Sequence, residues 1–211
     1  MKAVLISDTH CRLRNITVPE GDILIHAGDL TFRGNVAEIS QELREFERIA
    51  KKFKATYFVP GNHDWLAEHE PTLFKQMCKD VGITYLHDEW AVYEGSVIYG
   101  SGWTPEFCNW ALNAPRGQKL KEKWAQIPDK TDILITHGPP EGILDLIPDG
   151  TKVGCKDLFD RVAQVKPKLH VFGHIHHSYG VQHFDGITFV NASICTEQYR
   201  PTNKAVVIEL D

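Results

Sequence analysis

Five short runs rich in valine, isoleucine and leucine are the feature of this sequence that most restricts its fold. They are apolar at nearly every position, which is typical of strands buried on both faces. The runs cover residues 2–7, 22–27, 55–60, 132–136 and 169–173. Helical patterns lie between several of them, and strands that alternate with helices predict an α/β fold with a largely parallel central sheet.

Four segments between or beside these runs are predicted to be helices. Between residues 36 and 53 the apolar side chains form one stripe, and Asn35 followed by Glu38 resembles a capping box at the start of the segment. A second helix is expected to begin at Pro71 and to end at Gly82, because proline favours the first turn and glycine the last. The remaining two cover residues 117–126 and 155–165.

Other segments indicate antiparallel pairing. Asp185-Gly186 lies between two strand-like runs and is a strong hairpin signal. Residues 91–100 resemble a second hairpin, and residues 204–210 are expected to form a last strand. Since repeats, low-complexity tracts and linkers are missing, residues 1–211 are predicted to form a single domain.

Charge and cysteine usage exclude several classes of protein. The net charge is −5, and the longest basic cluster, at residues 51–54, falls at the end of a predicted helix. Binding to long nucleic acids needs clustered Lys and Arg, so we do not expect it. The five cysteines are odd in number and lack close spacing, which favours reduced thiols in the cytoplasm. The apolar runs are too short for a membrane span, so no membrane partner is expected either.

Aspartate, histidine or asparagine residues follow each of the five runs. Ligands of open α/β sheets bind beyond the carboxyl ends of the strands, so these side chains are expected to meet at one edge. They are Asp8 and His10, then Asp29, then Asn62, His63 and Asp64, then His137, and finally His174 and His176. Nitrogen and oxygen ligands without thiolates suit Mn, Fe, Ni or Zn. The set exceeds the needs of one ion, which predicts two ions ~3.5–4 Å apart.

The histidines outside this pattern are interpreted differently. His26 and His170 lie inside apolar runs and are expected to be structural. His69, His87 and His183 are given the same interpretation. His177 follows His176 directly, and on an extended segment its side chain would point away from the site.

At this point the sequence resembles a known family. The motifs "DTH" (8–10), "GDL" (28–30), "GNHD" (61–64), "THG" (136–138) and "GHIH" (173–176) are similar to those of calcineurin-like metallophosphoesterases. Further segments, such as "KPKLHVFGHIH" and "VNASIC", resemble the small metallophosphoesterase-domain proteins, and this likeness covers nearly the whole chain. The resemblance implies a four-layer α/β/β/α sandwich with two mixed sheets.

The resemblance also implies a role for each residue of the site. One metal ion would be held by Asp8, His10 and His176, the other by Asn62, His137 and His174, with Asp29 bridging both. A hydroxide between the ions would attack phosphorus in line, and His63 would protonate the leaving oxygen. Asp64 would either orient His63 or cap its loop.

We interpret the chain as a phosphodiesterase for small diesters such as cyclic nucleotides. Two divalent first-row ions are expected, with Mn²⁺ supporting activity in vitro. The residues proposed to bind substrate are Trp65, Trp103, Phe107 and Arg116. Trp110 is expected to pin its loop to the core, and Arg116 would either contact phosphate or cap the loop. The "SGWTP" of residues 101–105 replaces the family's "SPWTP", which leaves the shape of this loop open.

Several alternatives remain beside this interpretation. A phosphomonoesterase or nucleotidase could use the same site, and a scaffold of the same fold could bind metals without catalysis. A protein phosphatase is disfavoured because "GDLTFRG" (28–34) lacks the Asp and Arg of that class. DNA nucleases of the superfamily usually add segments for which 211 residues leave no room. Metallo-lactamases need an H-x-H-x-D-H run, which is missing.

Overall fold

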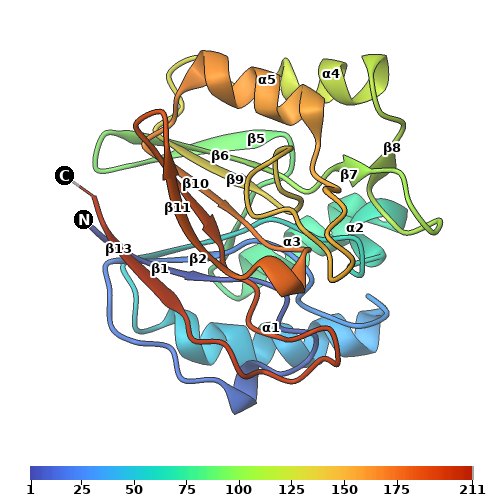
Figure 1. Ribbon diagram of the computed structural model, residues 1–211. Helices are drawn as coiled ribbons and strands as arrows, with labels where there is room; N and C mark the ends of the chain where they lie inside the picture. Colours follow the sequence, from blue (N-terminus) through green and yellow to red (C-terminus); the bar gives the residue numbers. More distant parts are fainter. Residues whose placement is uncertain (211) are drawn as a thin grey trace.

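Two mixed β-sheets pack face to face in this protein, and helices cover both outer faces (Figure 1). The computed structural model describes residues 1–210. This arrangement confirms the four-layer sandwich implied by the family resemblance. It differs from the one central sheet expected from the alternation of strands and helices, because the parallel strands are divided between two sheets.

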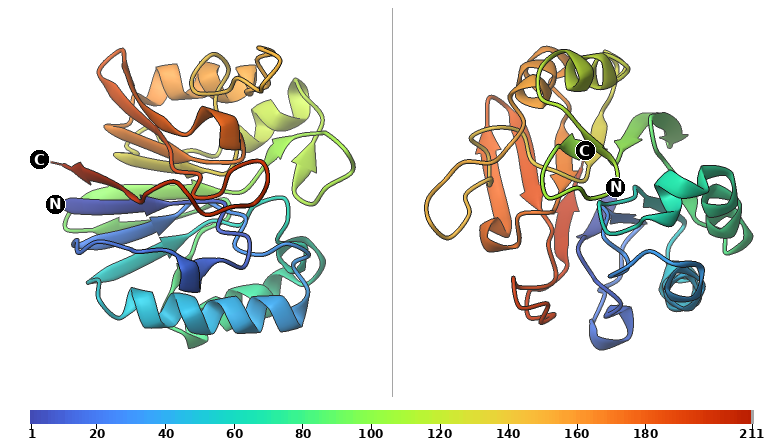
Figure 2. Two further views of the ribbon diagram at one scale, coloured as in Figure 1. Left: turned by 60° about the horizontal axis from the view of Figure 1, so that its bottom comes forward. Right: turned by 90° about the vertical axis from the view of Figure 1, so that its right-hand side faces the viewer.

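The first sheet has the strand order β13-β1-β2-β3-β4. Strands β1 to β4 are parallel, and β13 runs antiparallel to β1. The bounds are β1 (Lys2–Ile6), β2 (Ile23–His26), β3 (Ala55–Phe58), β4 (Thr84–Tyr85) and β13 (Val206–Glu209). The first and last strands of the chain therefore lie side by side, as Figure 2 shows.

The second sheet has the strand order β11-β12-β10-β9-β6-β5. Its central strands are parallel, and each edge is an antiparallel hairpin. The bounds are β5 (Glu89–Tyr93), β6 (Ser96–Ser101), β9 (Ile133–Thr136), β10 (Leu169–Phe172), β11 (Gly180–Phe184) and β12 (Ile187–Asn191). Both predicted hairpins are confirmed, and Asp185 and Gly186 have the positive φ angles, 48° and 79°, of a tight turn. A separate short pair joins β7 (Thr104–Pro105) to β8 (Asn113–Ala114).

The four predicted helices are all present. They are α1 (Val36–Ala50), α3 (Pro71–Asp80), α4 (Gln118–Trp124) and α5 (Lys156–Val165). Asn35 caps α1 by accepting a hydrogen bond from the Glu38 backbone N–H, and the Glu38 side chain reaches back to the N–H of Arg33. Shorter elements were not predicted: the helix α2 (Leu66–His69) and two 3₁₀ turns, η1 (Leu13–Asn15) and η2 (His176–Ser178).

The alternation of side chains along β1 explains why its run is apolar at every position. Val4 and Ile6 belong to the core beneath α1 and α3, whereas Ala3 and Leu5 pack against the second sheet. Strands of the second sheet repeat this pattern, with a third core beneath α4 and α5. Burial on both faces is thus correctly predicted, but the same run fits a cover made of helices or of another sheet. None of the helices in residues 1–210 combines the length and apolar character needed to cross a bilayer.

Candidate metal centre

The carboxyl ends of five parallel strands from both sheets meet at one edge of the sandwich. The loops after β1, β2 and β3 come from the first sheet, and those after β9 and β10 come from the second. They bring together every predicted ligand: Asp8, His10, Asp29, Asn62, His137, His174 and His176. Seven residues from five separate loops therefore lie close together in space.

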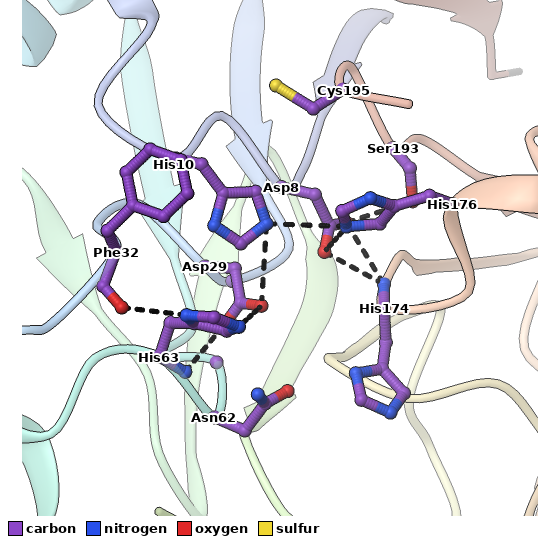
Figure 3. A network of polar contacts seen from close by, with 12 residues as sticks. Asp8, His10, Asp29, Phe32, Asn62, His63, His174, His176, Ser193 and Cys195 are labelled. Atoms are coloured by element: carbon purple, nitrogen blue, oxygen red, sulfur yellow. Dashed lines mark hydrogen bonds and ion pairs between the residues drawn. The ribbon is translucent and has the colours of Figure 1, made fainter. Parts of the chain in front are cut away.

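The ligand atoms form three overlapping groups. Asp8, His10 and His176 have atoms within 4.8 Å of one another, and so do Asp29, His137 and His174. His10, Asp29 and His63 form a third group, which joins the other two. Figure 3 shows His10 and His176 beside Asp8, with Asn62 and His174 on the other side of the network.

Asp29 lies between these groups. Its Oδ2 is 3.8 Å from His10 Nε2 and 3.4 Å from His137 Nε2. Asn62 Oδ1 joins the second group at 2.9 Å from His137 Nε2. This placement is the one a bridging carboxylate requires.

Three of these imidazole rings are oriented by backbone carbonyl groups. The Nδ1 atoms of His10, His137 and His176 lie 3.2, 2.9 and 3.0 Å from the carbonyl oxygens of Thr31, Ala27 and Thr196, respectively. A carbonyl oxygen can only accept, so each Nδ1 carries the hydrogen and each Nε2 turns its lone pair toward the centre. Such carbonyl partners are a common way of fixing a metal-binding tautomer.

Nitrogen and oxygen lone pairs are crowded together at the centre, and this arrangement fits the binding of divalent cations. His10 Nε2 is 3.3 Å from His176 Nε2, which in turn is 3.2 Å from Asp8 Oδ1. Lone pairs at these distances repel unless a proton or a cation lies among them. The donors are nitrogen and oxygen, since the Cys195 thiol is directed to the Thr9 carbonyl, and such donors suit Mn, Fe, Ni or Zn.

The electrostatics of the centre keep several of these groups in the deprotonated state that binds metal ions. Burial alone would raise the pKa of Asp8, but the hydrogen bond and charge of His176 hold it well below its usual range. Burial lowers the pKa of His10 to about 4 and that of His174 to about 3. These residues are therefore an anionic carboxylate and two neutral imidazoles near neutral pH, as metal binding requires.

Two rings of the metal-free centre are exceptions. Burial acts against it, but the hydrogen bond and charge of Asp8 outweigh burial and raise the pKa of His176. His137 is the second exception. Burial would lower its pKa, but the neighbouring Asp29 carboxylate outweighs burial and raises the pKa of His137 to about 9. A proton thus occupies the place of a cation between His137 and Asp29, and metal binding below that pH has to displace it.

The backbone is strained where it presents the ligands. Asp8, His10, Asp29 and His174 have positive φ angles of 51°, 40°, 56° and 67°. Such conformations cost energy in non-glycine residues and cluster at functional sites. The glycine beside His174 is required for another reason, since a Cβ on Gly173 would lie 2.0 Å from Asp8 Oδ2.

Gly173→Ala is expected to weaken metal binding by ~10- to 100-fold, the range found for groups that position ligands. The added methyl group has to displace the Asp8 carboxylate. Metal content after dialysis against graded metal concentrations measures the effect. Gly142→Ala is the control for backbone strain, because its φ of 81° disfavours alanine while its Cβ would meet open space. Unchanged affinity in Gly173→Ala would show that Asp8 is not a ligand.

Asp64 holds two loops of the site together. Its buried carboxylate accepts hydrogen bonds from the Gly61 N–H at 2.9 Å and from the N–H and hydroxyl of Thr31 at 3.1 and 2.8 Å. Burial, with the nearby Asp29 charge, raises the pKa of Asp64 to about 6. His63 is oriented instead by the Phe32 carbonyl, 2.7 Å from its Nδ1. The structure thus favours the loop role for Asp64 over the orienting role.

The predicted substrate-binding residues are only partly brought to the site. A cavity of about 280 Å³ opens over Asp29, Asn62 and His63, and Phe107 lines it with its ring centroid 5.0 Å from that of His174. The other three do not line this cavity: Trp65, Trp103 and Arg116.

Each of those three side chains has a structural partner. The Trp103 indole N–H donates to Asp88 at 2.8 Å, and Trp65 packs against the first core. Arg116 donates to the carbonyl oxygens of Val153 and Gly154, both at 2.7 Å, so it caps a loop, as the alternative interpretation had it.

Two aromatic residues of the cavity were not predicted. Trp110 lies over His63, with ring centroids 4.2 Å apart and an interplanar angle of 30°. Tyr199 meets His10 edge-on at 4.8 Å. Trp110 was expected to pin its loop, and Tyr199 lies in an irregular segment after β12 that carries no periodic pattern.

Comparison with known proteins gives consistent results. The family model described as calcineurin-like phosphoesterase matches residues 1–178. The chain is 40% identical to human metallophosphoesterase domain-containing protein 1 over 230 residues, which cover 98% of this chain and 70% of that protein. It is 35% identical over 219 residues to a UPF0046 protein of Caenorhabditis elegans, covering 98% of this chain and 74% of the relative.

Solved structures share the fold at low sequence identity. TT1561 of Thermus thermophilus superposes with a TM-score of 0.62 and 14% identity, covering 90% of this chain and 88% of that one. GAP50, described as the anchor in the inner membrane complex of Plasmodium, has a TM-score of 0.57 and 10% identity, with coverages of 92% and 71%. An anchor protein on this fold shows that function has to be argued from the site.

Proposed function

Because this chain belongs to the calcineurin-like phosphoesterase family, we propose that it is a metal-dependent hydrolase of small phosphodiesters, with cyclic nucleotides as candidate substrates. The observation that carries the proposal is that every expected ligand position at the edge of the two sheets has a suitable residue. Backbone carbonyl groups orient three of the imidazole rings. A scaffold that binds no metal would have no need of this preorganisation.

Seven side chains would hold two divalent ions. Asp8, His10 and His176 would bind one ion and Asn62, His137 and His174 the other, with Asp29 shared. When bound, the ions would neutralise charge on the phosphoryl oxygens and lower the pKa of a water molecule. Mn²⁺ is the ion proposed for activity in vitro. The five cysteines are free thiols in the described residues, which supports a reducing compartment such as the cytoplasm.

His63 is proposed as the general acid. Its Nδ1–H donates a hydrogen bond to the Phe32 carbonyl oxygen. Its Nε2 therefore faces the cavity, 4.0 Å from Asp29 Oδ2. In the protonated ring Nε2 carries a hydrogen that faces the cavity, and the Trp110 ring lies beside the His63 ring with their centroids 4.2 Å apart. The same proton can be given to the leaving oxygen of the ester.

The lining of the cavity supports a diester in preference to a monoester. Among its described lining residues there is no Lys or Arg, and Glu197 adds a negative charge at the rim. A diester carries one negative charge and a monoester up to two near neutral pH, so the diester is less repelled. Phe107, Trp110 and Tyr199 offer aromatic faces, on which a base can stack with ~1–3 kcal/mol.

The test is a comparison of kcat/KM with one metal. Protein stripped by a chelator is reconstituted with Mn²⁺ and assayed on bis(p-nitrophenyl) phosphate, p-nitrophenyl phosphate, and 2′,3′- and 3′,5′-cyclic nucleotides. We expect the diester to exceed the monoester by at least ~10-fold, a difference of about 1.4 kcal/mol. Stripped protein is expected to be inactive.

Each alternative has its own outcome. A preference for the monoester would support a phosphomonoesterase or nucleotidase. Stoichiometric Mn²⁺ binding without turnover of any ester would support a metal-binding scaffold. Cleavage of the synthetic diester without cyclic nucleotide turnover would leave the chemistry and remove the nucleotide. Full activity in a sample that elemental analysis shows to be metal-free would contradict the role of the metals.

A further inference from the structure

A second cavity of about 360 Å³ lies beside the metal centre. It shares Phe107, Ile147, His174 and Ile175 with the first cavity, so the two spaces meet at a proposed metal ligand. A phosphoryl group bound at the centre would therefore have room for an organic group on each side. A monoester has one such group, whereas a diester has two.

The walls of the second cavity are mainly apolar. Beyond the shared residues it is lined by Pro105, Gly138, Pro139 and Val153, and Glu106 is its one acidic lining residue in the described part of the chain. Arg116 also reaches it, but this guanidinium is occupied by the carbonyl oxygens of Val153 and Gly154. A cavity of this kind suits an aryl or alkyl group better than a charged one.

The position of His63 distinguishes the two cavities. His63 lines the first cavity with Trp110 and Tyr199 but does not line the second. A general acid has to lie within hydrogen-bonding reach of the leaving oxygen, so the leaving group belongs in the first cavity. The ester group that stays on phosphorus is then directed past His174 and Phe107.

We infer that the second cavity binds the retained ester group of the substrate and selects diesters in which this group is apolar, an aryl or alkyl arm. The inference rests on the proposed diesterase function and concerns acyclic diesters, because both ester oxygens of a cyclic nucleotide belong to one ribose and cannot enter two cavities. The shared wall formed by Phe107 and Ile147 would direct the two arms of the diester into different cavities.

The test varies the retained group and keeps the leaving group constant. The Mn²⁺-loaded protein is assayed on methyl p-nitrophenyl phosphate and phenyl p-nitrophenyl phosphate, both of which release p-nitrophenolate. Each kcat/KM is divided by the rate of alkaline hydrolysis, which corrects for intrinsic reactivity. We expect the phenyl ester to be favoured by ~10- to 100-fold, the gain from burying an aromatic group.

A cavity-filling variant locates the effect. Val153→Phe would occupy the second cavity and is expected to lower the phenyl-to-methyl ratio by at least ~10-fold. Val181→Phe is the matched control, because Val181 is exposed on β11, and it is expected to keep the wild-type ratio. Circular dichroism checks that both variants fold. If Val153→Phe does not fold, the phenyl-to-methyl ratio of the wild-type protein still tests the inference.

The outcomes separate the inference from the proposed function. A ratio near one in the wild-type protein, with both diesters cleaved, would overturn the second cavity as a subsite and leave the diesterase standing. An unchanged ratio in folded Val153→Phe would likewise overturn it. Cleavage of p-nitrophenyl phosphate without cleavage of either diester would overturn the proposed function itself.

Discussion

Asp29→Ala is expected to abolish activity and to release both metal ions. Its Oδ2 is 3.4 Å from His137 Nε2 and 3.8 Å from His10 Nε2, one residue from each ligand group. Removing one carboxylate therefore takes a ligand from two ions at once. Elemental analysis after gel filtration should find less than one ion per chain, whereas the wild-type protein is expected to retain two.

The stripped protein offers an independent measurement of the same variant. The Asp29 carboxylate is what raises the pKa of His137 to about 9, against the effect of burial. Without that carboxylate the pKa of His137 is expected to fall, since burial, which lowers it, remains. A pH titration of the ring followed by NMR measures this change.

Asp145→Ala serves as the control for general loss of stability. Asp145 is also a buried carboxylate, but it accepts hydrogen bonds from the N–H groups of Gly142 and Gly154, outside the centre. It is expected to keep both ions. Two tightly bound ions in Asp29→Ala would disprove the bridging role.

His63→Ala is expected to retain both metals and to lose rate according to the leaving group. General acids contribute ~10²–10⁴-fold, and a poor leaving group such as an alkoxide depends on the proton far more than p-nitrophenolate does. The loss should therefore be large for alkyl esters and small for nitrophenyl esters. A plot of log kcat/KM against leaving-group pKa should be steeper for the variant than for the wild type.

His183→Ala controls for the loss of a histidine in general. His183 is exposed on β11, where its Nδ1 lies 3.1 Å from the Thr188 hydroxyl. Its plot should coincide with that of the wild type. Equal losses on good and poor leaving groups in His63→Ala would argue that His63 binds the phosphoryl group or a metal ion instead.

The meeting of the polar side chains at one edge was predictable in part from a general rule, whereas their roles as ligands came from the family resemblance. Parallel strands of one sheet present their carboxyl ends at one edge, which groups Asp8 with Asp29. His137 follows β9 of the second sheet, and it was grouped with them on the expectation of a single sheet. The number of sheets could not be derived in this way. An apolar run such as residues 132–136 reports burial on both faces, but not whether a helix or a sheet provides it.

The aromatic residues that line the first cavity could not be predicted, for a different reason. Trp110 and Tyr199 lie in irregular segments, where neither a period of two nor one of 3.6 indicates a direction. Asp64 shows the same limit in a buried position, since its role depends on Gly61 and Thr31 donors that come from separate loops.

The pairing of β1 with β13, and of Asp8 with His174, has a consequence during synthesis of the chain. The backbone N–H of His174 donates to Asp8 across 166 positions of sequence. At ~5–20 residues per second, a ribosome would need about 10 to 30 seconds between making Asp8 and making this partner. Throughout that interval the first strand of the nascent chain has an open edge, and Asp8 and His10 lack the third member of their group, His176. The full set of proposed ligands is thus present only after the segment with His174 and His176 has emerged from the exit tunnel.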